Sequence, residues 1–220
     1  MHGLRTLALF CLVACACHTS AAVPAAATGE QLLLVSGSVT ALAIMLNTSY
    51  FLETKPAVPD NAGPFAIEGL DASGRSLFRF CFTPKEVADV VRVWQFTFAI
   101  PVTVATRDAL ATVRVTGPQR APATRTSAAG RKALLAKLSK GPGDPAADGG
   151  FAIERSSGDV VRLRYDSRAW AGVMISDPDT REVLAFGNDG TAAVLTSKKS
   201  LRLVFSDGVQ SAPQLVTIPR

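Results

Sequence analysis

The sequence predicts an all-β protein made of two small antiparallel β-sandwich blocks, residues 30–117 and 151–220. In several segments apolar residues alternate with polar ones at a period of two, which is typical of half-buried strands. Turn residues separate these short segments at roughly ten-residue spacing, a pattern typical of sandwiches and barrels. Hydrophobic residues make up 48% of the 220 residues and charged residues 19%, so the chain can bury a core. We expect one short helix in the first block and a flexible, part-helical connector over residues 118–150.

The chain begins with a predicted export signal over residues 1–17. Arg5 supplies a positive charge, and Leu7 to Ala14 form an apolar stretch shorter than the roughly 20 residues that cross a bilayer. Residues 18–29 are small, uncharged and interrupted by proline, which is typical of a tether. Both histidines lie in these two segments, so the blocks have no histidine to use as a base or a metal ligand.

The first block contains strand candidates separated by turn signals. Phe78, Phe80 and Phe82 share one face of a strand, and Trp94 to Ile100 form a second alternating segment. The remaining candidates are 32–35, 39–45, 49–53, 65–70 and 110–115. Thr83 followed by Pro84 and Glu86 has the form of a capping box, which predicts a helix over 85–90.

The connector, residues 118–150, carries the excess positive charge of the chain. It holds six Lys and Arg residues against two Asp, and a helix is expected over 131–140 with three leucines on one side. Arg131, Lys132 and Lys137 are candidate contacts for anionic lipid headgroups or envelope polymers, and the alternative is a solvated loop. No basic face with interleaved aromatic residues accompanies them, so no nucleic-acid partner is expected.

The second block contains seven short strand candidates in seventy residues, as a small sandwich or barrel requires. They are 151–154, 160–165, 172–176, 182–186, 192–196, 201–205 and 215–218. The turns between them are rich in Asp, Gly and Ser, for example Asn188-Asp189-Gly190.

The blocks lack the residue sets of the common catalytic classes. There is no Gly-x-Ser-x-Gly or Ser-x-x-Lys motif, and no glycine-rich phosphate loop, so we expect neither an enzyme nor a cofactor. Asp177, Asp179 and Glu182 crowd one turn and are a candidate Ca²⁺ site, although Asp-Pro-Asp-Thr also suits a type I turn. Cys81 is the only cysteine of the blocks, so we expect a small buried hydrophobic residue there and no disulfide within them.

Trp170 and Tyr165 lie near a predicted loop with polar neighbours. A tryptophan exposed there would be a contact for a sugar or a protein partner. The alternative is that both residues belong to the core.

The end of the apolar stretch, Leu12-Val13-Ala14-Cys15, resembles the lipobox of bacterial lipoproteins. The resemblance implies cleavage before Cys15 and acylation of that residue, which would hold the protein on a periplasmic or outer membrane. Ordinary secretion, with cleavage after residues 20–22 or 25–27, is the alternative. Either route places the protein outside the cytoplasm.

The whole pattern resembles bacterial envelope lipoproteins that carry immunoglobulin-like or fibronectin-like sandwiches. Residues 160–165, 177–184 and 201–209 are also similar in style to the non-catalytic C-terminal β modules of secreted bacterial peptidases. The sequence therefore predicts a non-enzymatic, exported binding or structural module with a protein or glycan partner. The alternatives are a carboxylate-dependent enzyme acting on glycans and an accessory or inhibitor subunit of a secreted hydrolase.

Overall fold

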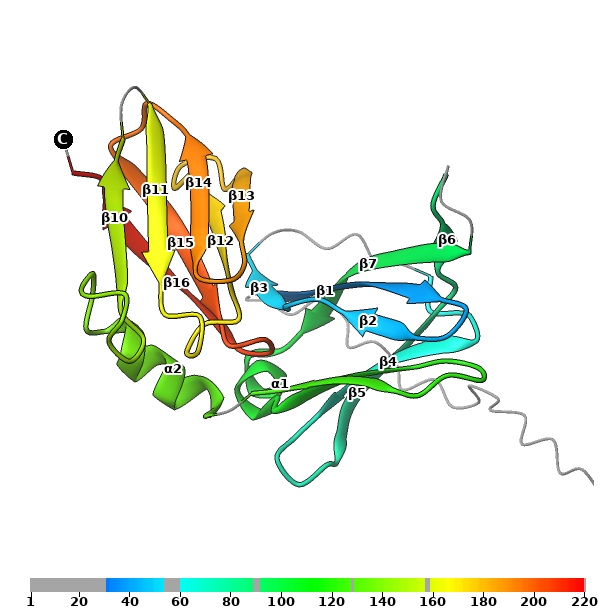
Figure 1. Ribbon diagram of the computed structural model, residues 1–220. Helices are drawn as coiled ribbons and strands as arrows, with labels where there is room; N and C mark the ends of the chain where they lie inside the picture. Colours follow the sequence, from blue (N-terminus) through cyan, green and yellow to red (C-terminus); the bar gives the residue numbers. More distant parts are fainter. Residues whose placement is uncertain (1–30, 54–59, 89–91, 128, 157–158, 220) are drawn as a thin grey trace, which may run out of the picture.

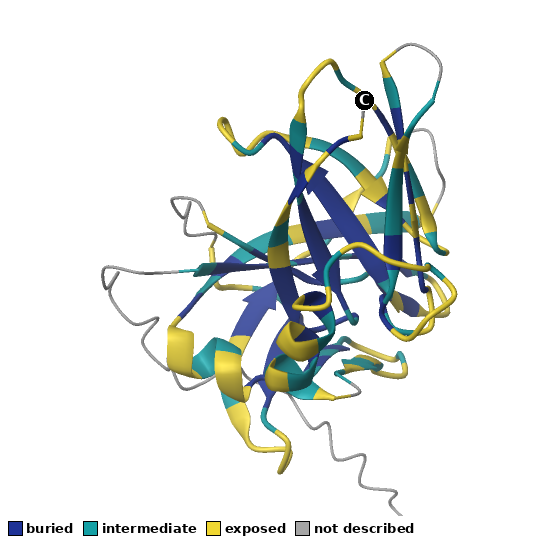
Figure 2. Cartoon of the chain, turned by 90° about the vertical axis from the view of Figure 1, so that its left-hand side faces the viewer, coloured by how far each residue is buried: buried dark blue, intermediate teal, exposed yellow. Residues whose placement is uncertain are grey.

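The computed structural model describes residues 31–53, 60–88, 92–127, 129–156 and 159–219, and it confirms the all-β class (Figure 1). Two β-sandwiches pack against each other, and Figure 1 shows the strands of the second running crosswise to those of the first. All the strand pairs are antiparallel. Buried residues follow the strand interiors, and the outer loops are exposed (Figure 2).

The first sandwich consists of two facing sheets. One has the order β2 (Ile44–Leu46), β1 (Gln31–Thr40), β7 (Val93–Val102), β6 (Lys85–Glu86), with β3 (Tyr50–Leu52) also paired to β1. The other has the order β5 (Ser76–Phe82), β4 (Phe65–Leu70), β8 (Thr112–Thr116), β9 (Ala123–Thr126). Both predicted aromatic faces point into the shared core, where the Phe82 ring lies 4.9 Å from Phe96 and 5.1 Å from Phe98.

The helix predicted over 85–90 is wrong. Lys85 and Glu86 form the short strand β6, which pairs with Gln95 and Trp94 on the edge of β7. A capping box favours a helix only weakly in so short a segment, because helix nucleation is costly, and pairing with an existing strand satisfies the same backbone groups. The short helix of this sandwich is instead α1 (Val104–Ala109), which Thr103 caps by accepting a hydrogen bond from the Thr106 amide at 3.1 Å.

The second sandwich contains all seven predicted strands. One sheet has the order β10 (Phe151–Arg155), β11 (Val160–Tyr165), β14 (Thr191–Leu195). The other has the order β13 (Val183–Gly187), β12 (Gly172–Ser176), β15 (Ser200–Ser206), β16 (Ser211–Thr217). Phe205 is fully buried between the sheets, and its ring centroid lies 4.8 Å from that of Phe151 and 5.3 Å from that of Trp170.

The predicted connector is more ordered in its described part than the sequence suggested. Its first portion contains β9, which extends a sheet of the first sandwich. The expected helix is present as α2 (Gly130–Leu138), and Leu134 and Leu138 are buried in the core of the second sandwich. Leu135, expected on the same side, is 45% exposed. Leu134 and Leu138, four residues apart on one side of the helix, dock it on this core.

Two further observations concern the predicted anchor and the cysteines. Among the described residues, no helix has the length and apolar character needed to cross a bilayer. Cys81 is buried as expected, and it is also disulfide-bonded, which was not predicted from the sequence. The predicted tether and Cys15 lie outside the described residues.

Candidate functional site

The two sandwiches share an apolar contact that fixes one against the other. Tyr50 of β3, Met174 of β12 and Val204 of β15 form a small buried cluster between them. Val209, in the turn between β15 and β16, reaches further and is buried in the core of the first sandwich. Burial of these side chains from both sides makes independent movement of the sandwiches costly.

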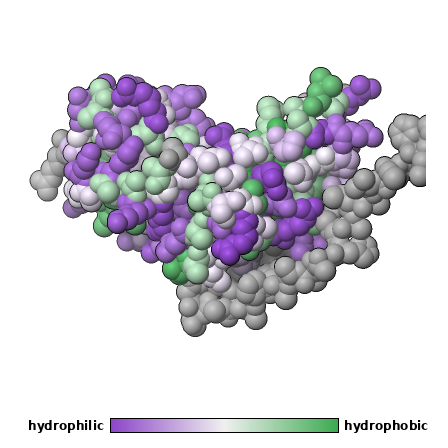
Figure 3. Space-filling view, turned by 90° about the horizontal axis from the view of Figure 1, so that it is seen from below, coloured by the Kyte–Doolittle hydropathy of each residue, from purple (hydrophilic) through white to green (hydrophobic). Residues whose placement is uncertain are grey.

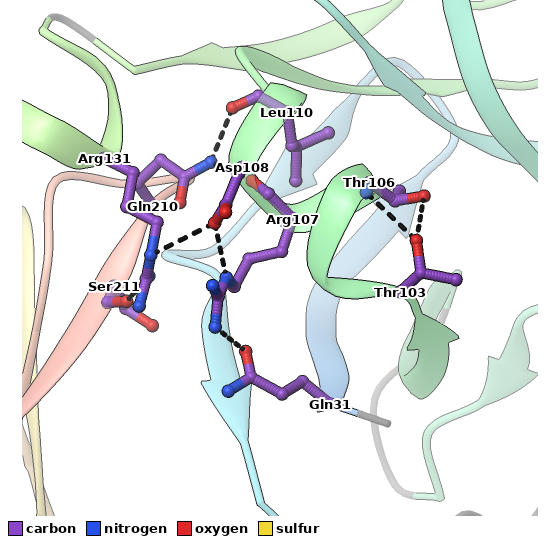
Figure 4. A network of polar contacts seen from close by, with 9 residues as sticks. All are labelled: Gln31, Thr103, Thr106, Arg107, Asp108, Leu110, Arg131, Gln210 and Ser211. Atoms are coloured by element: carbon purple, nitrogen blue, oxygen red, sulfur yellow. Dashed lines mark hydrogen bonds and ion pairs between the residues drawn. The ribbon is translucent and has the colours of Figure 1, made fainter. Parts of the chain in front are cut away.

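A polar network joins the same two units beside α1 (Figure 4). The Gln210 side-chain amide is fully buried and donates hydrogen bonds of 2.6 Å to the carbonyl oxygens of both Arg107 and Leu110. Arg131 donates to the Ser211 carbonyl oxygen at 2.8 Å and lies 3.3 Å from the Asp108 carboxylate. This arrangement places α2, α1 and the β15–β16 turn in one fixed group.

Hydrogen bonds of the backbone and of two serine hydroxyls complete the junction. The Ser49 amide donates to the Gly208 carbonyl oxygen at 3.1 Å, and the Ser206 hydroxyl donates to the Ser49 carbonyl oxygen at 2.6 Å. The Phe51 amide donates to the Ser211 hydroxyl oxygen at 2.7 Å. Hydrogen bonds between segments more than 150 residues apart in the chain therefore fix the two sandwiches against each other.

A groove of about 450 Å³ opens along this junction, and it is the candidate site. Binding sites are often found at the boundary between two domains, where both supply side chains to one concavity. The lining residues of the first sandwich are Leu34, Ser36, Asn47, Thr48, Tyr50 and Arg125. Those of the second are Ala171, Phe186, Asn188 and Asp189.

The wall from the second sandwich is a tight hairpin turn. Asp189 and Gly190 both have positive φ values, 57° and 87°, and Asn188 and Thr191 close the turn as a bridge. A two-residue Asp-Gly turn of this kind matches the twist of the flanking strands, β13 and β14. The turn holds the Asn188 amide and the Asp189 carboxylate at the edge of the groove.

Two aromatic rings form an apolar step inside the groove. Phe186 is 52% exposed, and its ring centroid lies 5.7 Å from that of Tyr50, which is almost fully buried. Burial raises the pKa of Tyr50, so its hydroxyl stays protonated and neutral at all physiological pH values. A Cβ at Gly172 would lie 2.5 Å from the Tyr50 hydroxyl oxygen, so glycine is required there to make room for the ring.

Three polar residues of the groove are held by hydrogen bonds to one or the other sandwich. Arg125 donates from Nε to the Leu46 carbonyl oxygen at 2.8 Å, and the Asn47 side-chain amide donates to the Ser36 hydroxyl oxygen at 3.2 Å. Thr48 donates from its hydroxyl to the Ala171 carbonyl oxygen at 3.4 Å. These contacts restrain side chains that line the groove.

The aromatic residues singled out from the sequence lie in the core and not on the surface. Trp170 is 1% exposed, and its indole nitrogen donates to the Gly149 carbonyl oxygen at 3.0 Å. Tyr165 is 4% exposed, burial raises its pKa, and among the described residues its hydroxyl has no hydrogen-bond partner. The structure thus supports the core interpretation of both residues over the contact interpretation.

The acidic turn is a self-contained structure. Asp177 accepts hydrogen bonds from the backbone amides of Asp179 at 2.8 Å and Thr180 at 3.1 Å, and it pairs with Lys198 at 2.8 Å. The Lys198 ammonium and these amides lower the pKa of Asp177 to about 2. Glu182 lies at the end of the turn. Its backbone carbonyl oxygen accepts a hydrogen bond from the Asp177 amide at 2.9 Å, and this bond closes the turn. In the described parts of the chain, no group of three acidic, His or Cys side chains is placed to hold a metal ion.

The basic candidates have different surroundings. Arg131 belongs to the junction network, with its side chain only 15% exposed. Lys137 pairs with Asp148 at 2.7 Å, and Lys132 is exposed on α2. Only Lys132 keeps the solvated position that the sequence suggested for all three.

Sequence reasoning found the Asn188-Asp189-Gly190 turn but missed its role as a groove wall. No local signal marks Tyr50 or Arg125, because each becomes a groove residue only through the packing of the two sandwiches. No protein-family model matches the chain, and neither a curated protein nor a solved structure is significantly similar to it. Fold and groove together define a class: a two-sandwich all-β protein with a polar groove at the junction.

Proposed function

We propose that this protein is an exported, non-enzymatic binding module that holds a glycan in the groove between its sandwiches. The observation that carries the proposal is the exposed ring of Phe186, set beside Tyr50 and flanked by the amide of Asn188. The envelope setting comes from the lipobox-like leader, with Cys15 as the acylated residue. A protein partner is the competing occupant of the same groove.

A sugar ring matches this chemistry because it has an apolar face and a rim of hydroxyl groups. The exposed ring of Phe186 offers a flat apolar surface for the C–H face of a sugar. Asn47 and Asn188 carry amides that both donate and accept, as hydroxyl groups require, whereas Arg125 donates only and Asp189, when ionised, accepts only. A groove with this mixture favours a polyhydroxylated ligand over a purely apolar one.

The groove does not have the carboxylates of a glycosidase. Glycoside hydrolysis commonly uses two carboxyl groups that face each other across the scissile bond. Asp189 is the only carboxylate among the described residues that line the groove. Asp177 and Asp179 are engaged with Lys198 and do not line it. Binding without cleavage is therefore the function that the groove supports best.

The test is binding of the purified full chain to an array of bacterial envelope oligosaccharides, followed by calorimetric titration of the best ligand. We expect F186A and N188A each to weaken binding by about tenfold or more, since both remove a direct contact. The control is L195A, because Leu195 is 76% exposed on β14 and does not line the groove. Unchanged affinity of F186A and N188A would refute the assignment, as would binding of peptides and no oligosaccharide. Mass spectrometry of the ligand after incubation should show no cleavage.

The export step has a separate test. The intact mass of protein recovered from its native membrane fraction should match a chain that begins at Cys15 and carries acyl groups. A mass that begins near Val23 or Thr28 without an adduct would instead indicate a secreted protein and remove the anchor.

A further inference from the structure

The turn between β1 and β2 presents an apolar surface to solvent. Leu42 at its tip is 89% exposed and Met45 is 54% exposed, and the two alanines on either side of Leu42 are exposed as well. Figure 3 shows strongly hydrophobic side chains protruding on the right, where the first sandwich lies, with hydrophilic side chains close by. Single exposed apolar residues are common, but a cluster of them at the tip of a hairpin is typical of an interaction surface.

The composition of this turn is unusual for one that faces water. Hairpin turns are usually rich in Gly, Asn, Asp and Ser, whereas this one reads Ala41-Leu42-Ala43. Thr40 supplies the missing polar contacts, because its hydroxyl oxygen accepts from the Ala43 amide at 3.0 Å and its own amide donates to the Ala43 carbonyl oxygen at 2.8 Å. The tip is therefore a closed turn in which Leu42 is exposed and the amide and carbonyl of Ala43 are both paired with Thr40.

An apolar hollow and two arginines lie next to the tip. The hollow is about 230 Å³ in volume and is lined mainly by Val39, Phe65, Pro84 and Trp94, with Arg120 at its rim. Arg120 donates from Nε to the Thr40 carbonyl oxygen at 2.8 Å. Arg92, which is exposed, directly precedes Val93, the partner of Thr40 in the β1–β7 pairing. β6, which pairs with β7, carries two exposed residues of opposite charge, Lys85 and Glu86, so it adds no net charge.

We propose that this end of the first sandwich enters the headgroup region of a membrane that contains anionic lipids. Leu42 and Met45 would reach the acyl boundary, and Trp94 would lie at the level of the headgroups, where tryptophan is enriched. Arg92 and Arg120 would contact the lipid phosphates while their stems stay on apolar surface. The contacts of Thr40 lower the cost of such insertion, since the amides of Leu42 and Ala43 enter the lipid already paired with its hydroxyl oxygen.

The tip and the proposed acyl anchor can reach the same membrane. β1 spans 10 residues from Gln31 to Thr40, which is about 33 Å at ~3.3 Å per residue. Residues 16–30, between Cys15 and β1, span up to about 50 Å when extended. Apolar side chains that enter the membrane beside an acyl anchor would add to its attachment. Only the sharing of one membrane by the two contacts depends on the acyl anchor. The proposed contact of the tip with lipid does not depend on it.

The test uses tryptophan fluorescence of the full chain mixed with vesicles of phosphatidylcholine and phosphatidylglycerol that carry brominated acyl chains. L42W places a reporter at the tip, and L195W places a matched one on an exposed site of the second sandwich. We expect a blue shift and quenching of L42W and neither change for L195W, with the native tryptophans subtracted. Equal, water-like emission of both variants on bound protein would overturn the proposal.

A second measurement separates the tip from the anchor. In flotation assays, the double variant L42S/M45S should lower partitioning of the non-acylated protein by about tenfold or more. Retention of full partitioning by the double variant would contradict the proposal. A blue shift of L42W without vesicles that grows with protein concentration would also contradict it, because the tip would then contact a second copy. If the protein from the native membrane fraction carries no acyl adduct while L42W is still quenched by the vesicles, the anchor is refuted and the tip contact stands.

Discussion

Replacement of Gln210 by alanine should loosen the junction that forms the groove. The Gln210 side-chain amide donates two hydrogen bonds of 2.6 Å, to the carbonyl oxygens of Arg107 and Leu110 at the end of α1. Both bonds join the two sandwiches, and Gln210 is fully buried. The variant leaves two acceptors without this donor and a small space in the junction.

The magnitude follows from these contacts. A net contribution of about 1 kcal/mol for each hydrogen bond, and more for a carbonyl left buried and unpaired, gives a loss of roughly 3–4 kcal/mol. The Gln210 side-chain oxygen is buried without a partner among the described residues, and its removal returns about 1 kcal/mol. The expected loss of unfolding free energy is therefore about 2–3 kcal/mol.

Urea denaturation followed by tryptophan fluorescence measures this loss, and the same variant should bind the groove ligand more weakly because the walls are less fixed. Q95A is the matched control, since Gln95 is exposed on β7 and should change stability by less than ~0.5 kcal/mol. If Q210A is as stable as Q95A, the hydrogen bonds of Gln210 do not hold the junction and the reasoning is wrong.

Three further predictions concern single positions. G172A should push the Tyr50 ring from its place, lower the melting temperature and weaken ligand binding in the same titration, whereas an unchanged affinity would show that the ring position does not matter. F205A should cost about 3–5 kcal/mol in urea denaturation, because the ring fills the centre of the second core, and a loss below ~1 kcal/mol would argue against that packing. The Lys198 ammonium, with the amides of Thr180 and Asp179, lowers the pKa of Asp177 from 3.8 to about 2. These contacts, the ion pair among them, stabilise the folded state above pH 4, and the stabilisation is lost as the pH falls from about 4 to about 2. Thermal melts from pH 2 to 6 should show a smaller pH dependence for D177N, and an identical profile would exclude the pair as its source.

Local sequence patterns were sufficient for most strands. The seven strands of the second sandwich and the aromatic faces around Phe82 and Phe96 follow from alternation and turn residues, both of which act over a few neighbouring positions. The helix with Leu134 and Leu138 was also predicted, because its periodicity is local.

The failures share a different cause. Lys85 and Glu86 were expected in a helix but pair with β7. The candidate strands 32–35 and 39–45 left out residues 36–38, which lie within β1. In both places a neighbouring strand supplies hydrogen bonds that no local propensity reports. The disulfide of Cys81 was missed for a different reason, since sequence spacing does not give cysteine connectivity.

The sequence by itself determined the fold class, the positions of most strands, the docking helix and the absence of the common catalytic motifs. These properties depend on the chemistry of residues close together in the chain. Only the tertiary structure decided the groove, because Tyr50, Arg125 and Phe186, which come from three distant segments of the chain, come together only at the junction. It also decided that Trp170 is buried and Leu42 exposed, since burial depends on which surfaces the two sandwiches cover.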